Sequence, residues 1–272
     1  MKFFNAAVTG LFDLLFWPFS GLGPIWSLVV FSLLAGVLML WIFGLVSDQD
    51  SIRVIRDRVR GNLIAIRLFG DDLGVLFRLQ GRLLRDNMVF LRYALMPLLV
   101  MIVPVLLIIV QLNLRYSARP LEPGETATVR VELRDPSIIE RGVALEAPDG
   151  VSVETPGVRV LQQREVAWRI RADRPGNFRL VVRAGDVAVE KELRVGQGWG
   201  ATSSLRASSL GDLLLYPGEP PIDESQVVEA IEITYRQLDL SLFGWSVDWL
   251  VLFFVLSLAS GFAFRKVLGV EI

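Results

Sequence analysis

The stretch IWSLVVFSLLAGVLMLWIFGLV, residues 25–46, holds 22 consecutive residues without a charge. A second run of 22 uncharged residues, YALMPLLVMIVPVLLIIVQLNL, occupies residues 93–114. An α-helix needs roughly 20 apolar residues to cross the hydrocarbon core of a bilayer, which is about 30 Å thick. Both stretches therefore predict helices that span a membrane, the first over residues 25–47 and the second over residues 93–114.

A shorter uncharged run, residues 249–264, predicts a third span over residues 246–264, although it has only 16 residues. Trp245 and Trp249 are suited to one membrane interface. Arg265 and Lys266 can extend their charged ends into water at the other interface. The alternative is a buried amphipathic helix in the same place.

The composition agrees with a membrane protein and excludes several kinds of chemistry. Of the 272 residues 53% are hydrophobic, and the mean hydropathy of +0.49 is too high for an ordinary soluble globule. The chain has no cysteine and no histidine, so disulfides, thiolate nucleophiles, His-dependent triads and imidazole metal sites have no residues to form them. The net charge of -1 gives no sign of specific nucleic-acid binding. We therefore expect neither an enzyme nor a bound cofactor.

Arginines indicate the orientation of the spans, because Lys and Arg gather in short loops on the cytoplasmic side. Eight of them separate the first two spans: Arg53, Arg56, Arg58, Arg60, Arg67, Arg78, Arg82 and Arg85. Arg92 follows at the start of the second span. The segment 48–92 and the tail 265–272 are therefore predicted to be cytoplasmic, and the N-terminus and the long segment after the second span to lie outside. The expected location is a bacterial inner (plasma) membrane.

Residues 1–24 predict an amphipathic helix in the outer membrane interface rather than a cleaved signal peptide. Its polar residues form a narrow stripe on an otherwise apolar helix, namely Lys2, Asn5, Thr9 and Asp13. Pro18 and Pro24 end the helix before the first span begins. A re-entrant half-hairpin is the alternative, and Trp17 favours the interfacial placement.

The cytoplasmic segment 48–92 predicts an antiparallel helical hairpin. Apolar residues recur every three or four positions over residues 52–69, and Gly70, Asp71 and Asp72 supply a helix stop and a new N-cap. No strong helix breaker follows before the second span, so the second hairpin helix should run directly into it, with kinks at Pro97 and Pro104. The arginines serve topology and solvation, or form a basic platform for anionic lipid headgroups, ribosomal RNA or an acidic nascent chain.

Beyond residue 118 the hydrophobic period changes from that of a helix to that of a strand. Val129, Val131 and Leu133 alternate with charged residues, and Pro-Gly and Asp-Gly turns recur about every ten residues. The pattern predicts an all-β, immunoglobulin-like sandwich of roughly seven strands over residues 118–196, outside the cytoplasm. Trp168 is expected in its core rather than in a ligand site. Residues 197–245 are predicted as a loop-rich connector, with a strand or an interfacial segment within 228–242.

The order of these elements resembles the Oxa1 superfamily of membrane protein insertases, and most of all its minimal three-span branch. The closest local similarity is residues 262–269, FAFRKVLG, which is similar to the family's last span, basic residue and hydrophobic-Leu-Gly ending. The resemblance implies a partly hydrophilic groove that eases polar segments into the bilayer. A basic residue within the spans, common in that family, is missing here, and the β-sandwich insertion is unusual for the three-span branch.

Seven residues are the candidates for such a groove and its cytoplasmic mouth. They are Arg53, Arg56, Arg60, Arg92, Gln111, Asn113 and Ser257. One hypothesis is a protein that assists the insertion or assembly of other membrane proteins, with the lipid bilayer, nascent membrane proteins or other complex subunits as partners. The alternative is a non-enzymatic scaffold or accessory subunit of a membrane complex with an extracytoplasmic binding domain. A water-accessible groove favours the first, and tight apolar helix packing favours the second.

Overall fold

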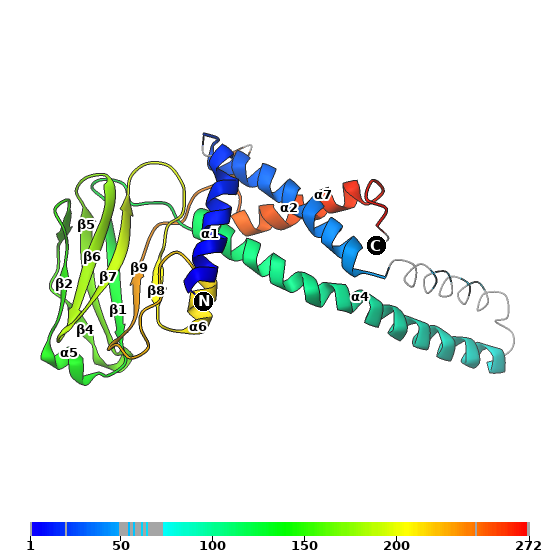
Figure 1. The fold of residues 1–272 in the computed structure, drawn as a ribbon, viewed down its shortest axis with the longest axis horizontal. Coiled ribbons are helices and arrows are strands. Elements are labelled where there is room, and N and C mark those ends of the chain that lie inside the picture. Colours follow the sequence, from blue (N-terminus) through cyan, green and yellow to red (C-terminus); the bar gives the residue numbers. More distant parts are fainter. Residues whose placement is uncertain are drawn as a thin grey trace. The chain divides into compact units, whose positions relative to one another are not determined.

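A computed structural model describes residues 2–19, 21–48, 54, 57, 61, 64, 73–242 and 244–270. The chain divides into two compact units. One contains residues 1–27 and 108–249, and the other contains residues 28–107 and 250–272. Helices dominate the second unit and antiparallel strands the first, so the predicted combination of a helical part and a β-rich part is observed (Figure 1).

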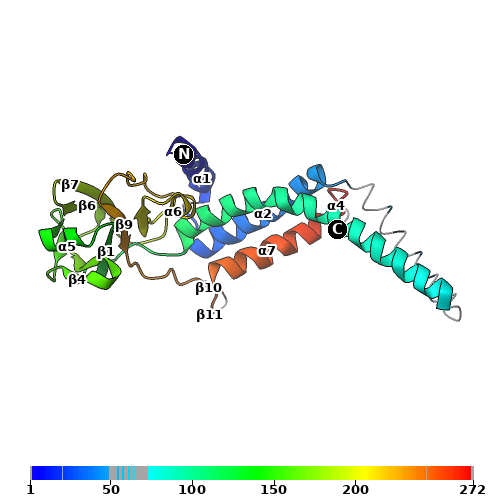
Figure 2. The ribbon, with the colours of Figure 1, turned by 90° about the horizontal axis from the view of Figure 1, so that it is seen from below.

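The helical unit is built mainly from α2 (Pro24–Val46), α4 (Leu73–Tyr116) and α7 (Trp249–Phe264). The ribbon of α2 crosses that of α7 in Figure 1, and Figure 2 shows the same helices from below. By length and composition α2 and the 80–116 part of α4 are long and apolar enough to cross a membrane, whereas α7 is a shorter apolar helix of 16 residues. α4 is continuous over 44 residues with Pro97 and Pro104 inside it, which confirms that the helix before the second predicted span runs directly into it. Most of residues 49–72, including the predicted hairpin turn, lies outside the described residues.

Small residues bring α2 and α7 into close contact. A Cβ atom added to Gly36 would lie 2.2 Å from the main-chain oxygen of Ser257, so only glycine fits there. Ser260 also donates a hydrogen bond across the interface to the main-chain oxygen of Leu33 at 2.8 Å. Ser32 and Gly36 on one helix and Ser257 and Gly261 on the other repeat the small-xxx-small spacing that lets helix backbones approach.

The family-like ending of the chain forms the turn that terminates α7. The N–H of Val270 donates to the carbonyl of Arg265 at 3.0 Å, and Gly269 has a positive φ of 64°, as at a helix end closed by a left-handed residue. Val270 is buried and packs against Gly44 of α2. Helix capping therefore accounts for Gly269, and packing accounts for Val270, the residue that follows it.

The described part of the β-rich unit contains two main antiparallel sheets and the two-stranded antiparallel pair β10-β11 (Figure 1). The larger has the order β3-β5-β1-β9-β8, with β4 also paired to β5; its strands are β1 (Thr126–Leu133), β3 (Val151–Val153), β4 (Val158–Val160), β5 (Glu165–Ala172), β8 (Leu205–Ala207) and β9 (Val228–Ile233). The smaller has the order β2-β6-β7, with β2 (Val143–Glu146), β6 (Gly176–Ala184) and β7 (Val187–Val195). The remaining elements of the described residues are α1 (Lys2–Phe16), η1 (Trp17–Phe19), α5 (Ser137–Arg141), η2 (Leu161–Gln163), α6 (Leu210–Leu215), β10 (Ser241–Leu242) and β11 (Trp245–Ser246).

One hydrophobic core joins the two sheets. Val129 and Trp168 are paired residues of β1 and β5, and both are buried in it with Leu180 and Val182 of β6. The alternating pattern of the sequence therefore reports burial directly, and the prediction that Trp168 belongs to the core is confirmed. Gly157 lies so close that an added Cβ would be 2.9 Å from the indole nitrogen of Trp168.

The β-sandwich extends beyond the predicted boundary at residue 196, because β8 and β9 come from the segment predicted as a connector. β9 lies between β1 and β8, and its residues Val228, Ile231 and Ile233 are fully buried. A strand within 228–242 was one of the two predicted alternatives for this segment, and β9 occupies it. β7 ends at Val195 and β9 begins at Val228, so 32 residues separate the two strands in the chain. The larger sheet therefore takes an internal strand from well beyond the predicted end of the sandwich.

A buried ion pair fastens this segment to β7. Lys191 occupies an inward position of β7 between Val189 and Leu193, and its ammonium group donates to the Glu219 carboxylate and to the main-chain oxygen of Ser203. Burial lowers the pKa of Lys191, and the Glu219 charge opposes that shift. The second carboxylate oxygen of Glu219 accepts the N–H of Glu192 at 2.9 Å. The free edge of β7 is thus covered by side chains instead of by another strand.

Candidate functional site

The helical unit contains an apolar groove of about 300 Å³ among α2, α4 and α7. Its walls are Gly36, Met39, Leu40, Phe43, Leu98, Met101, Val105, Phe253, Phe254, Ser257, Leu258, Gly261 and Phe262. Ser257 is the one polar side chain among them, and its hydroxyl donates to the main-chain oxygen of Phe254 at 3.2 Å. The groove therefore offers van der Waals contact to an apolar segment and almost no hydrogen bonding to a polar one.

The helix surfaces around the groove are apolar as well. On α4 the side chains of Leu98, Leu99 and Val103 are exposed, and on α7 those of Val255 and Leu258 are exposed. A soluble protein rarely leaves such a large contiguous apolar surface uncovered. Lipid or another protein must cover these faces for the helices to be stable.

The β-rich unit contains a second cluster, where α1 (Lys2–Phe16) packs on the last turns of α4 (residues 111–116). Gln111 donates to the Thr9 hydroxyl at 3.1 Å and accepts from the guanidinium of Arg115 at 2.7 Å. Arg115 also binds the carboxylate of Asp13. Only 2% of Arg115 is exposed, so its charge is neutralised by these neighbours rather than by water.

Aromatic side chains close the same cluster. The rings of Tyr116 and Trp199 stack at a centroid distance of 5.2 Å, and the guanidinium of Arg115 lies 5.1 Å from the ring centre of Phe16. The Tyr116 and Ser27 hydroxyls share a hydrogen bond of 2.8 Å. The indole of Trp199 donates to the main-chain oxygen of Leu22 at 3.2 Å. These contacts fix α1, the start of α2 and the end of α4 to one another.

The polar stripe of α1 therefore contacts protein at Thr9 and Asp13. On the apolar part of the helix Phe12 and Phe16 are buried as well, and the remaining side faces outward. Leu11 and Leu14 of that side are exposed, Leu14 by 68%, and Trp17 follows them at the end of the helix. An apolar outer face is what both predicted placements of this helix, interfacial and re-entrant, require.

Of the seven residues predicted for the groove and its mouth, the four that the structure describes do not share one set of contacts. Arg53, Arg56 and Arg60 lie outside the described residues. Arg92 is exposed on α4 and is not among the groove-lining residues.

The polar residues predicted for the spans have separate surroundings. Gln111 belongs to the cluster around Arg115. Asn113 is half-buried, and its main-chain oxygen accepts a hydrogen bond from the Ser117 hydroxyl at 2.6 Å. Ser257 is the one candidate in the groove. The side chain of Gln111 is thus engaged in structural hydrogen bonds at the end of α4 and not in the groove.

Two buried cations were missed by the sequence analysis. Arg115 directly follows the second uncharged run, and its signal is Gln111 one turn earlier together with Asp13 in the N-terminal helix. Lys191 occupies an inward-facing position in an alternating strand, where an apolar residue is expected. In the part of the chain that the structure describes, no group of three or more acidic residues could hold a metal ion.

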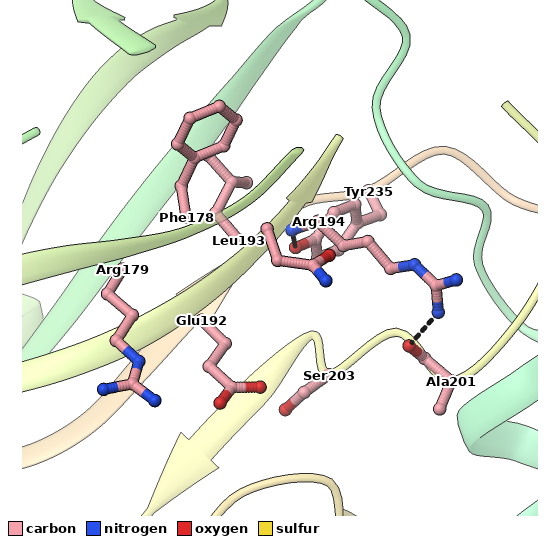
Figure 3. Close-up of a pocket in the computed structure, with 9 residues that line it drawn as sticks. Phe178, Arg179, Glu192, Leu193, Arg194, Ala201, Ser203 and Tyr235 are labelled. Atoms are coloured by element: carbon pink, nitrogen blue, oxygen red, sulfur yellow. Dashed lines mark hydrogen bonds between the residues drawn. The ribbon is translucent and has the colours of Figure 1, made fainter. Parts of the chain in front are cut away.

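A third candidate is a polar pocket of about 510 Å³ on β6 and β7 (Figure 3). Its walls are Asn177, Phe178, Arg179, Glu192, Leu193, Arg194, Ala201, Ser203 and Tyr235. Its volume lies within the roughly 300–1,000 Å³ of ordinary ligand sites. It differs from the groove in carrying charges of both signs.

No protein-family model and no curated protein matches the chain. A crystal structure of domains 4 and 5 of the S-layer protein SbsC is 20% identical with a TM-score of 0.23, over 30% of this chain and 48% of that chain. The S-layer protein structure rSbsC(31-844) is 16% identical with a TM-score of 0.23, over 48% of this chain and 22% of that chain. The chain thus spans less than half the length of either structure, and similarity this low carries no argument about fold or function.

Proposed function

We propose that this chain is a non-enzymatic integral membrane protein that assists the assembly of other membrane proteins by holding one of their apolar transmembrane segments in the groove among α2, α4 and α7. The observation that carries the proposal is the composition of the groove, whose walls are aliphatic, aromatic, methionine and glycine residues apart from Ser257. Methionine and glycine suit such a role, because Met39 and Met101 adapt to different partners and Gly261 permits a close backbone approach.

In this proposal α2, α4 and α7 all cross the bilayer, and the arginine-rich segment before residue 92 lies in the cytoplasm. The β-rich unit then lies on the opposite side, as an immunoglobulin-like domain of the bacterial cell exterior or periplasm. The apolar faces of α4 and α7 would be covered by lipid or by the bound segment.

The resemblance to the Oxa1 superfamily favours a second candidate, an insertase that eases polar segments through the bilayer. The order of the elements supports it, and the apolar lining of the groove does not. The two candidates differ in what occupies the groove: an apolar segment of a stable partner or a polar segment during translation.

A photo-crosslinking amino acid placed at Ser257 and Leu98 tests the proposal, with Val103 as the matched control on α4. Val103 is exposed but is not a groove residue. We expect the groove positions to capture transmembrane segments of a restricted set of membrane proteins and Val103 to capture mainly lipid. Capture of lipid alone at all three positions would contradict the proposed function, and capture only in translating cells would favour the insertase.

Topology can be tested independently in this cysteine-free chain. Cysteines introduced at the exposed positions Asn87 and Asp149 should react with an impermeant thiol reagent from opposite sides of the membrane. Reaction of both from the same side would refute the proposed orientation.

A further inference from the structure

The polar pocket of the β-rich unit has a floor made of two paired strands. Arg179 of β6 lies opposite Glu192 of β7, and Asn177 lies opposite Arg194. Their side chains point away from the sandwich core, and the segment containing Ala201 and Ser203 forms the facing wall (Figure 3). The pocket is thus held by a rigid ladder on one side and by the segment that Lys191 fastens on the other.

Arg194 is held ready for a ligand. Its Nη1 donates to the main-chain oxygen of Ala201 at 3.0 Å. Gly200, whose φ is +151°, leaves the necessary room, because an added Cβ would lie 2.8 Å from that nitrogen. A guanidinium has five N–H donors. Within the described part of the chain one of them, on Nη1 of Arg194, donates to a protein oxygen, so the other N–H groups of Arg194 can bind an anion.

Tyr235 adds a second donor beside Arg194. Its hydroxyl oxygen accepts the N–H of Arg194 at 3.3 Å, and within the described part of the chain no acceptor is recorded for the hydroxyl hydrogen. Burial raises the pKa of Tyr235, so this hydrogen is retained at neutral pH. Arg179 contributes a second positive charge, with the Glu190 carboxylate 3.6 Å away on the exposed surface, and Glu192 is the one acidic side chain that lines the pocket.

The spacing of the two arginines indicates the kind of anion. Arg179 and Arg194 are diagonal neighbours across the β6–β7 ladder, since Arg179 pairs with Glu192 and Arg194 is two residues further. Diagonal neighbours in an antiparallel pair are about 7–8 Å apart. Alternate side chains of an extended peptide are roughly 6.5–7 Å apart, because each residue advances about 3.3 Å. Carboxylates at positions i and i+2 of an extended peptide therefore match both arginines.

We infer that this pocket binds an acidic peptide segment with the pattern Glu-x-Glu, supplied by a protein on the same side of the membrane as the β-rich unit. The inference deepens the proposed function by naming a partner surface, and it rests on that function only for the location of the partner. A groove that captures no segment would leave the peptide binding intact, so the two can fail separately.

Fluorescence anisotropy on the full chain in a neutral detergent tests the inference, with labelled Ser-Glu-Ser-Glu-Ser as the probe and Ser-Gln-Ser-Gln-Ser as its control. We expect saturable binding of the acidic probe alone. Arg194→Gln should weaken it by at least about tenfold, because charge-assisted hydrogen bonds are lost. Glu192→Gln should tighten it about two- to fivefold by removing like-charge repulsion.

Arg183→Gln is the matched control, because Arg183 is an exposed arginine of β6 that pairs with Glu146 outside the pocket. It should change the affinity less than about twofold. If Arg194→Gln also lowers the melting temperature, Arg179→Gln replaces it, since the Arg179 side chain is 69% exposed and its ion pair with Glu190 is a surface pair that contributes little stability.

Three results would overturn the inference. They are absence of saturable binding to the acidic probe, equal loss in Arg183→Gln, and tighter binding of a soluble polyuronate than of the peptide. The last of these would assign the pocket to an acidic glycan.

Discussion

Leu99 of α4 and Val158 of β4 are almost equally exposed, at 60% and 58%, yet they belong to opposite kinds of surface. On β5, the strand that pairs with Val158's strand, buried apolar residues alternate with exposed charged ones. Elsewhere in the β-rich unit, ion pairs such as Arg183 with Glu146 join neighbouring strands. Around Leu99 the neighbours on α4 are exposed leucines, valines and isoleucines without a charge. The exposed fraction of a side chain alone therefore does not show what kind of medium covers it. The β-rich unit has its charges on the outside, whereas the helical unit has an apolar exterior suited to hydrocarbon.

The buried cations of the chain repeat this contrast. Lys191 has a partner as buried as itself, since only 2% of the Glu219 side chain is exposed. Arg115 is buried too, but 60% of the side chain of Asp13 is exposed. If one residue of a fully buried ion pair is removed, the remaining charge has no contact with water. If one residue of the pair is exposed, water can take the place of the lost partner.

The largest effect is therefore expected from Lys191→Met. It leaves the Glu219 carboxylate buried without its cation, so the β-rich unit should lose about 3–5 kcal/mol of stability, measured by near-ultraviolet circular dichroism during unfolding of the full chain. The double variant Lys191→Met, Glu219→Leu should recover most of the loss, because it removes both charges together. A single variant that unfolds like the wild type would show that the pair is not a structural lock.

The second test compares Leu99→Asp with Val158→Asp, which place the same charge at equal exposure. In a bilayer Leu99→Asp should cost about 2.5–3.5 kcal/mol of insertion free energy, whereas Val158→Asp on a hydrated strand should change stability by no more than about 0.5 kcal/mol. Membrane fractionation and protease protection measure the first, and thermal unfolding measures the second. If Leu99→Asp inserts as efficiently as the wild type, α4 does not cross the hydrocarbon core.

The sequence predicted well those elements whose pattern of apolar residues is regular along the whole element. The apolar runs gave α2, α4 and α7 because each is uniform over its length. The third span was predicted over residues 246–264, and α7 covers the uncharged run Trp249–Phe264 within it. The alternation around Val129 and Trp168 gave the core of the sandwich because each strand has one buried face.

The remaining features depend on partners that are distant in the chain. β9 pairs with β1 across about 100 residues, and nothing local in residues 228–233 specifies that neighbour. The polar residues of α1 suggested a face toward water, but Gln111 and Arg115 supply hydrogen-bond partners more than 100 residues away. Likewise Gln111 was predicted to be a polar residue of the groove, because a sequence does not show which hydrogen bonds a polar side chain makes in the folded protein.

A smaller effect is expected at the contact between α2 and α7. Gly36→Ala places a Cβ against the main-chain oxygen of Ser257, where no side chain can move away, and should destabilise the helix pair by about 1–3 kcal/mol. Gly81→Ala in α4 is the control, because nothing lies within 4 Å of its added Cβ. It should be neutral or stabilising by about 0.5–1 kcal/mol, since alanine favours a helix. Thermal inactivation in detergent separates the two, and equal melting temperatures would mean that the close approach is absent.

The smallest expected effect concerns a partly exposed pair near the surface of the β-rich unit, Glu125 with Arg119, whose side chains are 15% and 20% exposed. The two guanidinium nitrogens of Arg119 bind the Glu125 oxygens at 2.7 and 2.9 Å, and this bond, followed by the N–H of Glu122, lowers the pKa of Glu125 from about 4.5 to about 2. A depressed folded pKa gives stability that is complete above about pH 4.5 and is lost as the pH falls toward about 2.

Because water also reaches this pair, the contribution should not exceed about 1 kcal/mol. Glu125→Gln should therefore melt below the wild type at pH 6, and the two melting curves should converge as the pH approaches 2. Arg119→Gln should show the same pH dependence with a smaller amplitude, since it removes the main cation that lowers the pKa of Glu125 while Arg236 stays 3.2 Å from that carboxylate. A difference between wild type and Glu125→Gln that stays constant from pH 6 to pH 2 would mean that the glutamine disturbs packing instead of removing an ion pair.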